Sequence, residues 1–255
     1  MKAMILAAGL GTRLRPFTED RPKALVTVAG RTLLEIALNR LITFGVREVI
    51  VNTHHYADMV LDYLKANNNF GIRIEVSSEP TLLDTGGGLK NAAWFFLDSN
   101  SNLDKPLILH NVDVISTIDL GRMMRFHAEH NGLATLAVQD RETSRYLLFN
   151  EEGQLCGRRA ACDIDAESDE ALVARSAQKV EPLAFSGVHI ISSQIFSKMN
   201  EEGAFSIIDA YLRLAAEGER IIAFRADNYY WRDLGRPESV VQAAQDIASG
   251  RYSDT

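Results

Sequence analysis

The feature that most restricts the fold is a regular alternation between short apolar runs and longer segments with helical spacing of their apolar residues. The strand-length runs are 2–8, 48–53, 72–78 and 106–113, and the helical segments are 32–45, 57–68 and 87–96. Strands that alternate with helices at this spacing predict a parallel sheet covered by helices on both faces. We therefore expect an α/β, Rossmann-like, mixed and mainly parallel sheet flanked by helices.

The pattern changes after about residue 140. Residues 145–157 resemble a hairpin that turns at Glu151 to Gly153, and the charged stretch 163–179 has the composition of a surface excursion. Later segments predict strands at 184–192, 220–227 and 229–235 and helices at 206–218 and 237–249. No linker composition interrupts the chain. We expect a single domain over 1–255, in two parts that meet at about residue 140, the second more elaborated than the first.

Composition excludes several classes of protein. The apolar run at the N-terminus is too short for a membrane span or a signal peptide, which favours a cytoplasmic protein without a membrane partner. The net charge of -7 argues against a nucleic-acid surface, although a local phosphate site needs only a few cations. Two cysteines, Cys156 and Cys162, form neither a disulfide framework nor a zinc cluster. The sequence leaves a monomer and a homodimer open.

The loop after the first apolar run combines glycines with cations. Gly9 and Gly11 allow backbone N–H groups to converge on a phosphate, although a tight turn from strand to helix would use the same residues. The Rossmann and Walker A patterns do not fit, because Leu14 stands at the third glycine and no G-K-[ST] follows. Arg13 and Lys23, with Arg15 between them, supply the charge that suits a triphosphate.

The stretch "AAGLGTRLRPFTEDRPKALVTVAGRTLLE" closely resembles the signature of the sugar-1-phosphate nucleotidyltransferases. The segments "EPTLLDTGGGLKNA", "HNVDV", "FSGVHII" and "YYWRDLGRPE" resemble further family segments, so that the resemblance spans residues 1 to about 240. Within the family, the chain is most similar to the subgroup of mannose-1-phosphate guanylyltransferase-like proteins and N-acetylmuramate-1-phosphate uridylyltransferases. The resemblance implies an enzyme that joins a nucleoside triphosphate, UTP or GTP, to a sugar-1-phosphate, releasing pyrophosphate and making a nucleotide sugar for the cell wall or a surface polysaccharide.

The resemblance also implies a nucleotide-binding part at 1–140, a sugar-binding and closing part at 141–255, and roles for particular residues. Arg13, Lys23 and Asp113 would be catalytic, and Asp113 and Asp233 would hold Mg2+ against phosphate oxygens. The implied nucleotide-binding residues are Leu6, Ala7, Ala8, Gly9, Gly11, Thr12, Arg13, Glu79 and Gly86. The implied sugar-binding residues are Asn111, Tyr146, Lys179, Ser186 and Gly187.

Two positions depart from the family pattern. Val112 stands where the metal-binding turn has glycine, and a β-branched residue tolerates positive φ poorly and adds bulk where the sugar phosphate should approach. We expect either a reshaped sugar pocket or weakened activity. Arg236 replaces a common threonine and adds a charge that could contact phosphate or lie at the start of the last helix.

Two alternative functions stay open: a cytidylyltransferase acting on a phosphorylated alcohol, and a sensor that binds nucleotide or sugar phosphate without turnover.

Overall fold

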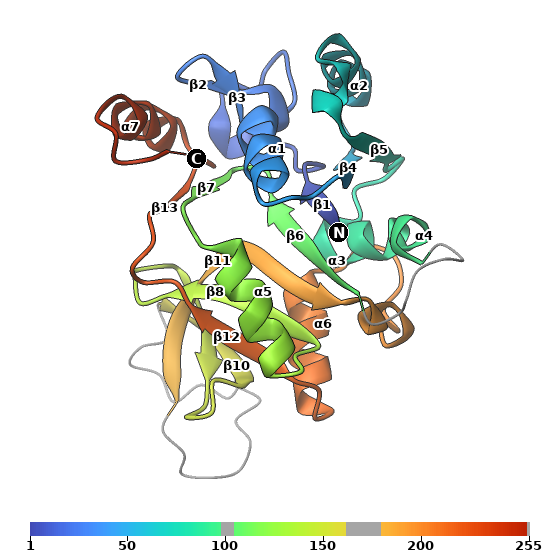
Figure 1. The fold of residues 1–255 in the computed structure, drawn as a ribbon, viewed down its shortest axis with the longest axis vertical. Helices are drawn as coiled ribbons and strands as arrows, with labels where there is room; N and C mark the ends of the chain where they lie inside the picture. Colours follow the sequence, from blue (N-terminus) through green and yellow to red (C-terminus); the bar gives the residue numbers. More distant parts are fainter. Residues whose placement is uncertain (98–104, 162–179, 254–255) are drawn as a thin grey trace.

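The computed structural model describes residues 1–97, 105–161 and 180–253. Within these residues, nine strands form one central sheet (Figure 1). They are β1 (Lys2–Leu6), β4 (Glu48–Thr53), β5 (Arg73–Ser78), β6 (Pro106–Asn111), β8 (Ala134–Gln139), β9 (Arg145–Phe149), β10 (Leu155–Ala160), β11 (Glu181–Ser192) and β12 (Ile221–Arg225). The hydrogen-bonded order is β10-β9-β11-β6-β1-β4-β5, and β8 pairs with both β11 and β12.

The first half of the sheet is parallel, as predicted. β1 lies between β4 and β6, with Leu6 beside Asn52 on one neighbour and beside Asn111 on the other. β5 continues the parallel arrangement next to β4, whereas β11 runs antiparallel to β6. The carboxyl ends of β1, β4 and β6 therefore meet at one edge, which is where ligands bind in open α/β sheets.

Helices cover both faces because alternate residues of the strands point to opposite sides. The helices are α1 (Leu33–Thr43), α2 (Ala57–Ala66), α3 (Asp84–Asn91), α4 (Ala93–Phe96), α5 (Leu120–Glu129), α6 (Ile207–Ala216) and α7 (Pro237–Ala248). Ala3 and Ile5 of β1 join a core with α1, α2, α5 and α7, while Met4 and Leu6 join a second core with α3, α4 and α6. Each fully buried aliphatic side chain contributes roughly 1.5–3 kcal/mol.

Short elements complete the chain between the longer ones. They are the 3-10 turns η1 (Thr12–Leu14), η2 (Lys23–Leu25), η3 (Asn68–Gly71) and η5 (Ser193–Ser197) and the strands β2 (Thr27–Val28), β3 (Arg31–Thr32), β7 (Val114–Ser116) and β13 (Trp231–Asp233). β13 pairs with β7, which brings the C-terminal part of the chain to the end of β6. Figure 1 shows α7, near the C-terminus, beside β2 from the N-terminal region. No helix among the described residues has the length and apolarity needed to cross a membrane.

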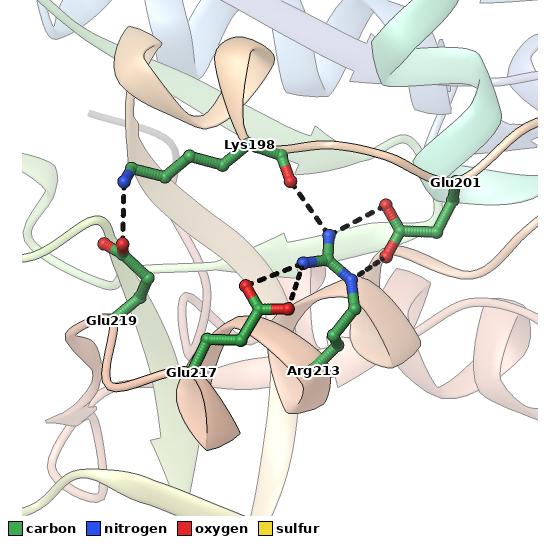
Figure 2. A network of polar contacts seen from close by, with 5 residues as sticks. All are labelled: Lys198, Glu201, Arg213, Glu217 and Glu219. Carbon is green, nitrogen blue, oxygen red and sulfur yellow. Dashed lines mark hydrogen bonds and ion pairs between the residues drawn. The ribbon is translucent and has the colours of Figure 1, made fainter.

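An ion-pair network ties α6 to the segment before it (Figure 2). The Arg213 guanidinium donates from Nε and Nη2 to the Glu201 carboxylate at 2.7 and 3.1 Å, and from Nη1 to both carboxylate oxygens of Glu217. Lys198 accepts from Arg213 through its carbonyl and donates through Nζ to Glu219. The segment held in this way also contacts α3, because Lys90 Nζ donates to the carbonyl of Glu201.

We expect Arg213→Met to lower the free energy of unfolding at pH 7 by about 1–3 kcal/mol, since hydrogen bonds to charged groups contribute on this scale. Arg213 lowers the pKa of Glu201 by hydrogen bonding, so this stabilisation is complete above the ordinary carboxyl pKa and is lost as pH falls through the lowered value. Thermal unfolding from pH 7 to pH 3 measures the difference. Arg122→Met, on the exposed face of α5, is the control. If Arg213→Met lowered the free energy of unfolding equally at pH 7 and pH 3, the ionic origin of this stabilisation would be contradicted.

Candidate active site

The loop after β1 begins the site. The amide of Ala7 donates to Asn52 Oδ1 at 2.7 Å, which fixes the end of β1 against β4. Gly11 adopts a left-handed conformation with φ 65°, and its carbonyl accepts from Leu14 N and from Thr18 Oγ1. A Cβ at Gly11 would lie 2.9 Å from Thr18 Cγ2, so this tight turn requires glycine. The turn leaves Arg13 exposed to solvent at the sheet edge.

Lys23 links this loop to the end of β6. The residue begins η2 directly after Pro22, and its Nζ donates to Asp113 Oδ2 at 2.6 Å. The side chains of Lys23 and Asp113 are only 15% and 9% exposed. The Lys23 ammonium also lies 3.8 Å from the position of a Cβ on Gly9. A positive charge from the N-terminal loop is therefore held between the glycine turn and the Asp113 carboxylate.

The pairing of β13 with β7 brings Asp233 to Asp113. Asp233 is opposite Val114 in the antiparallel register, and the amide of Leu234 donates to the Asp113 carbonyl at 2.7 Å. A Cβ on Gly235 would lie 2.7 Å from Asp233 Oδ1 and 3.6 Å from Asp113 Oδ2. The same point is 3.1 Å from Arg13 Nη2. Two carboxylates and the Arg13 guanidinium thus converge around one residue without a side chain.

The electrostatics of this cluster favour added positive charge. Burial raises the pKa of Asp233, and the neighbouring Asp113 carboxylate raises it further. The Gly235 amide, which donates to Asp233 Oδ1 at 2.5 Å, acts in the opposite direction, as do the charges of Lys23 and Arg13. These cations only partly offset the burial of two like charges. A divalent cation beside both carboxylates would offset the negative charge that these cations leave unbalanced.

The donor set fits a hard divalent cation. Both side chains offer carboxylate oxygen, which Mg2+ prefers, and Mg2+ usually takes only one or two protein carboxylates together with substrate phosphates. Within the described parts of the chain, no group of three or more His, Cys, Asp and Glu side chains forms a denser metal cage. Asp113 and Asp233 therefore suit a metal shared with phosphate rather than a structural metal.

Gly235→Ala should disrupt this convergence. The new methyl would lie 2.7 Å from Asp233 Oδ1, closer than real Cβ contacts, and 3.1 Å from Arg13 Nη2, which is tighter than most of them. We expect kcat/KM of the catalysed reaction to fall at least about tenfold, since a misplacement of about 1 Å can cost 100-fold. Steady-state kinetics and thermal unfolding measure the effect. Gly121→Ala, on α5, is the control for the substitution itself, because φ there is not positive and the nearest atom to the new Cβ, Asp119 Oδ1, would be 3.2 Å away. Unchanged kinetics would show that the space at Gly235 is not used.

On the predicted nucleotide side, Glu79 and Gly86 already have protein partners. Glu79 is buried, and its carboxylate accepts from Asn52 Nδ2 at 2.7 Å and from the Leu83 amide at 3.0 Å. The amide of Gly86 donates to the carbonyl of Phe205, whose ring occupies the space of a Cβ on Gly86. These contacts order the loop before α3 and its packing against the segment before α6. A contact of either residue with the base stays a prediction.

The predicted sugar-side residues are only partly brought together. Gly187, with φ 73°, lies beside Asn111, because a Cβ there would be 2.9 Å from Asn111 Nδ2. Ser186 is fully buried, and its hydroxyl contacts Gln139 Oε1 at 3.5 Å. Tyr146 lies on β9, with its hydroxyl 3.4 Å from the Thr143 amide. Lys179 lies outside the described residues.

The steric expectation for Val112 is wrong. The side chain is fully buried in the core to which α1, α2, α5 and α7 contribute, so its bulk is not exposed beside Asp113. Val112 is also absent from the described non-glycine residues that have positive φ. Its amide donates to the Leu6 carbonyl at 3.1 Å, which keeps the turn in register with β1. Arg236 is the other departure from the family pattern. It is exposed and lies at the start of α7, which is one of the two locations that the sequence left open.

Sequence reasoning missed Arg141, which lies beside β13. Its guanidinium carbon is 3.6 Å from the centre of the Trp231 ring, and its Nη2 donates to the Phe185 carbonyl at 2.8 Å. The Trp231 indole in turn donates to the Ser186 carbonyl at 2.7 Å. Arg141 follows the end of β8, and neither that strand nor α5 was predicted. The rule that ligands gather after strands would have found the residue once β8 was recognised.

Comparison with known proteins agrees with this arrangement. A family model described as nucleotidyl transferase matches residues 2–250. The N-acetylmuramate alpha-1-phosphate uridylyltransferase of Caulobacter vibrioides is 33% identical over 253 residues, covering 96% of each chain. The mannose-1-phosphate guanylyltransferase of Mycobacterium tuberculosis is 25% identical over 252 residues, and this chain spans 65% of its length.

A solved structure supports the fold. The crystal structure of HddC from Yersinia pseudotuberculosis complexed with GMP-PN superposes with a TM-score of 0.73 at 22% identity, covering 96% of this chain and 99% of that one. At this identity the likeness concerns the fold alone. The predicted α/β fold, the predicted resemblance and the predicted enzyme class are thereby confirmed, because family match, extended identity and topology agree. The chain belongs to the nucleotidyl transferase family.

Proposed function

We propose that the enzyme joins UTP to a hexose-1-phosphate, releasing pyrophosphate and forming a UDP-sugar. The observation that carries this proposal is the convergence of Arg13, Asp113 and Asp233 around Gly235, with Lys23 paired to Asp113. Cations facing a carboxylate pair suit two polyanionic substrates that share a metal ion. The uridylyltransferase from Caulobacter supports UTP, since its identity to this chain extends over nearly the whole of both proteins.

The N-terminal loop would hold the nucleotide phosphates. A left-handed residue followed by helical residues turns successive N–H groups to one side, an arrangement that binds anions. Gly11 and η1 have this conformation, so the amides of Gly11 and Thr12 would contact the β- and γ-phosphates. The exposed Arg13 guanidinium would pair with the same oxygens. These contacts stabilise the charge that develops on the departing pyrophosphate.

The attacking group needs no general base, because the oxygen of a sugar-1-phosphate is already an anion. The obstacle is the repulsion between that anion and the α-phosphate. Lys23, held at 2.6 Å from Asp113, would contact both phosphates as they approach. We infer that the metal is Mg2+, and a divalent ion bound by Asp113 and Asp233 would supply further charge neutralisation at these oxygens. Asn111 and Gly187, which lie beside each other, would border the sugar.

A matrix of substrates tests this proposal. Pyrophosphate release and product mass are measured for UTP, GTP, CTP, ATP and dTTP, each with glucose-, mannose-, N-acetylglucosamine- and N-acetylmuramic acid-1-phosphate, with Mg2+ and with EDTA. We expect one UTP pairing to dominate and EDTA to abolish it. A CDP-alcohol formed from CTP and a phosphorylated alcohol would identify the cytidylyltransferase alternative. Nucleotide binding without any turnover would identify a sensor.

A further inference from the structure

Asp246 is a buried carboxylate on α7 that the proposed reaction does not use. Val240, Ala243 and Asp246 are buried and follow one another at intervals of three residues, so they share one face of the helix. Val240 and Ala243 pack in the same core as α1 and α5. The Asp246 side chain is only 3% exposed. A charge at such a position costs free energy unless other groups pair with it.

The groups that pair with Asp246 come from β13 and from the residue before it. Arg232 donates from Nε and Nη2 to Asp246 Oδ2 at 3.0 and 2.7 Å, and the Tyr230 hydroxyl donates to the same oxygen at 2.7 Å. Two longer contacts, from Gln242 at 3.4 Å and Arg251 at 3.5 Å, reach Asp246 Oδ1. The buried carboxylate therefore ties β13 to α7.

These contacts fix the register of β13. Tyr230 and Arg232 are two residues apart, so they lie on one side of the extended chain, and Asp233 lies on the other. The antiparallel ladder between β13 and β7 is only three residues long and forms a separate sheet. A slip of one residue along β7 would turn Asp233 away from Asp113. The contacts with Asp246 are made in the register that brings these two carboxylates together.

We propose that Asp246 is a positioning residue for Asp233: through Tyr230 and Arg232 it holds β13 in the register that places Asp233 beside Asp113. This inference rests on the proposed function and deepens it. Asp246 acts through the strand rather than by contact with the reacting groups. Loss of its charge therefore weakens binding of the divalent cation, whereas a saturating concentration of the cation restores the reaction.

The test measures metal binding without turnover. Asp246→Asn keeps the size of the side chain and removes its charge. Mn2+ binding is followed by electron paramagnetic resonance with UTP present and sugar phosphate absent. We expect the dissociation constant for Mn2+ to rise about 10- to 100-fold, the usual effect of losing a group that supports a metal ligand. In kinetics, the Mg2+ concentration that gives half the maximal rate should rise similarly, while kcat at saturating Mg2+ stays within about threefold.

Hydrogen exchange in the metal-free protein tests the cause. The Leu234 amide donates to the Asp113 carbonyl at 2.7 Å, so its protection reports on the position of β13. We expect residues 229–235 to exchange at least about fivefold faster in Asp246→Asn, because the strand opens more often. Exchange of β4, in the central sheet, should stay unchanged.

Further variants separate positioning from general stability. Glu201→Gln removes the carboxylate that pairs with Arg213. It should lower the midpoint of thermal unfolding without changing Mn2+ binding. Arg232→Met removes the other partner of the Asp246 contact and stays informative if Asp246→Asn does not fold. Combining Arg232→Met with Asp246→Asn should weaken Mn2+ binding by no more than about twofold beyond either single variant, because the two residues act as one unit.

The outcomes distinguish this inference from the proposed function. If the wild type forms a nucleotide sugar and folded Asp246→Asn shows unchanged Mn2+ binding and unchanged exchange, the inference alone is overturned. A low kcat that saturating Mg2+ does not restore would also overturn it, since Asp246 would then act on more than the position of a metal ligand. Weaker Mn2+ binding by Asp246→Asn, with no nucleotide sugar formed by the wild type, would overturn the proposed function and support the inference.

Discussion

Asp113→Asn is expected to lower kcat for nucleotidyl transfer by at least about 1000-fold, which corresponds to roughly 4 kcal/mol of transition-state stabilisation. The substitution keeps the shape of the side chain but removes the charge that faces both Lys23 and the proposed metal position beside Asp233. Removing it leaves Asp233 as the single carboxylate of the pair. Steady-state kinetics over a range of Mg2+ concentrations measure the loss.

The matched control for Asp113→Asn is Asp119→Asn, on an exposed residue that caps α5. It removes the same charge near the same face of the fold but away from the cluster, and we expect its kcat to stay within about twofold. Thermal unfolding shows whether the Asp113 variant is folded. A folded Asp113→Asn enzyme that keeps more than a tenth of the wild-type kcat would exclude the metal-binding role.

Lys23→Met is expected to have the second largest effect, a fall in kcat of about 100- to 10,000-fold. The estimate follows from the cost of removing one preorganised charge at a phosphoryl transition state. Lys23 is placed for this role because its ammonium lies between the Gly9 turn and Asp113, at 2.6 Å from the carboxylate. Kinetics at saturating UTP and sugar-1-phosphate measure kcat separately from KM.

A titration with Mg2+ separates contact with phosphate from support of Asp113. If Lys23 only holds Asp113, the methionine variant should recover the wild-type kcat once Mg2+ saturates. If it stabilises the transition state, kcat stays low at every Mg2+ concentration, which is the result we expect. Lys65→Met, on the last turn of α2, controls for loss of a lysine elsewhere. Recovery of kcat at high Mg2+ would reassign Lys23 as a positioning residue.

Local sequence patterns were sufficient for most of the fold. The predicted strand at 48–53 is β4, and the helix predicted at 32–45 is α1, shorter by a residue or two at each end. Periodicity works here because both elements bury one clear set of apolar residues. The helix predicted at 87–96 is instead α3 and α4, separated at Ala92. α3 also begins earlier, at Asp84, because segments packed against its glycines stabilise it.

The site was less accessible to sequence reasoning because long-range pairing builds it. Gly11 and Lys23 could be identified from a loop that combines glycine with cations. The approach of Asp233 to Asp113 depends on the pairing of β13 with β7, which no local pattern specifies. The glycines of α3 allow close packing of protein segments, a use that composition does not distinguish from ligand binding. Likewise, the buried core position of Val112 becomes visible only in the folded chain.

The most direct measurement follows the phosphorus atoms of UTP. The enzyme is incubated with Mg2+, a hexose-1-phosphate and UTP labelled with 32P at either the α- or the γ-position, and the products are separated. The account predicts that α-label appears in a UDP-sugar and γ-label in pyrophosphate, in equal amounts, and that neither appears with Asp113→Asn. Release of γ-label as orthophosphate, or formation of pyrophosphate without labelled UDP-sugar, would contradict nucleotidyl transfer to the sugar phosphate.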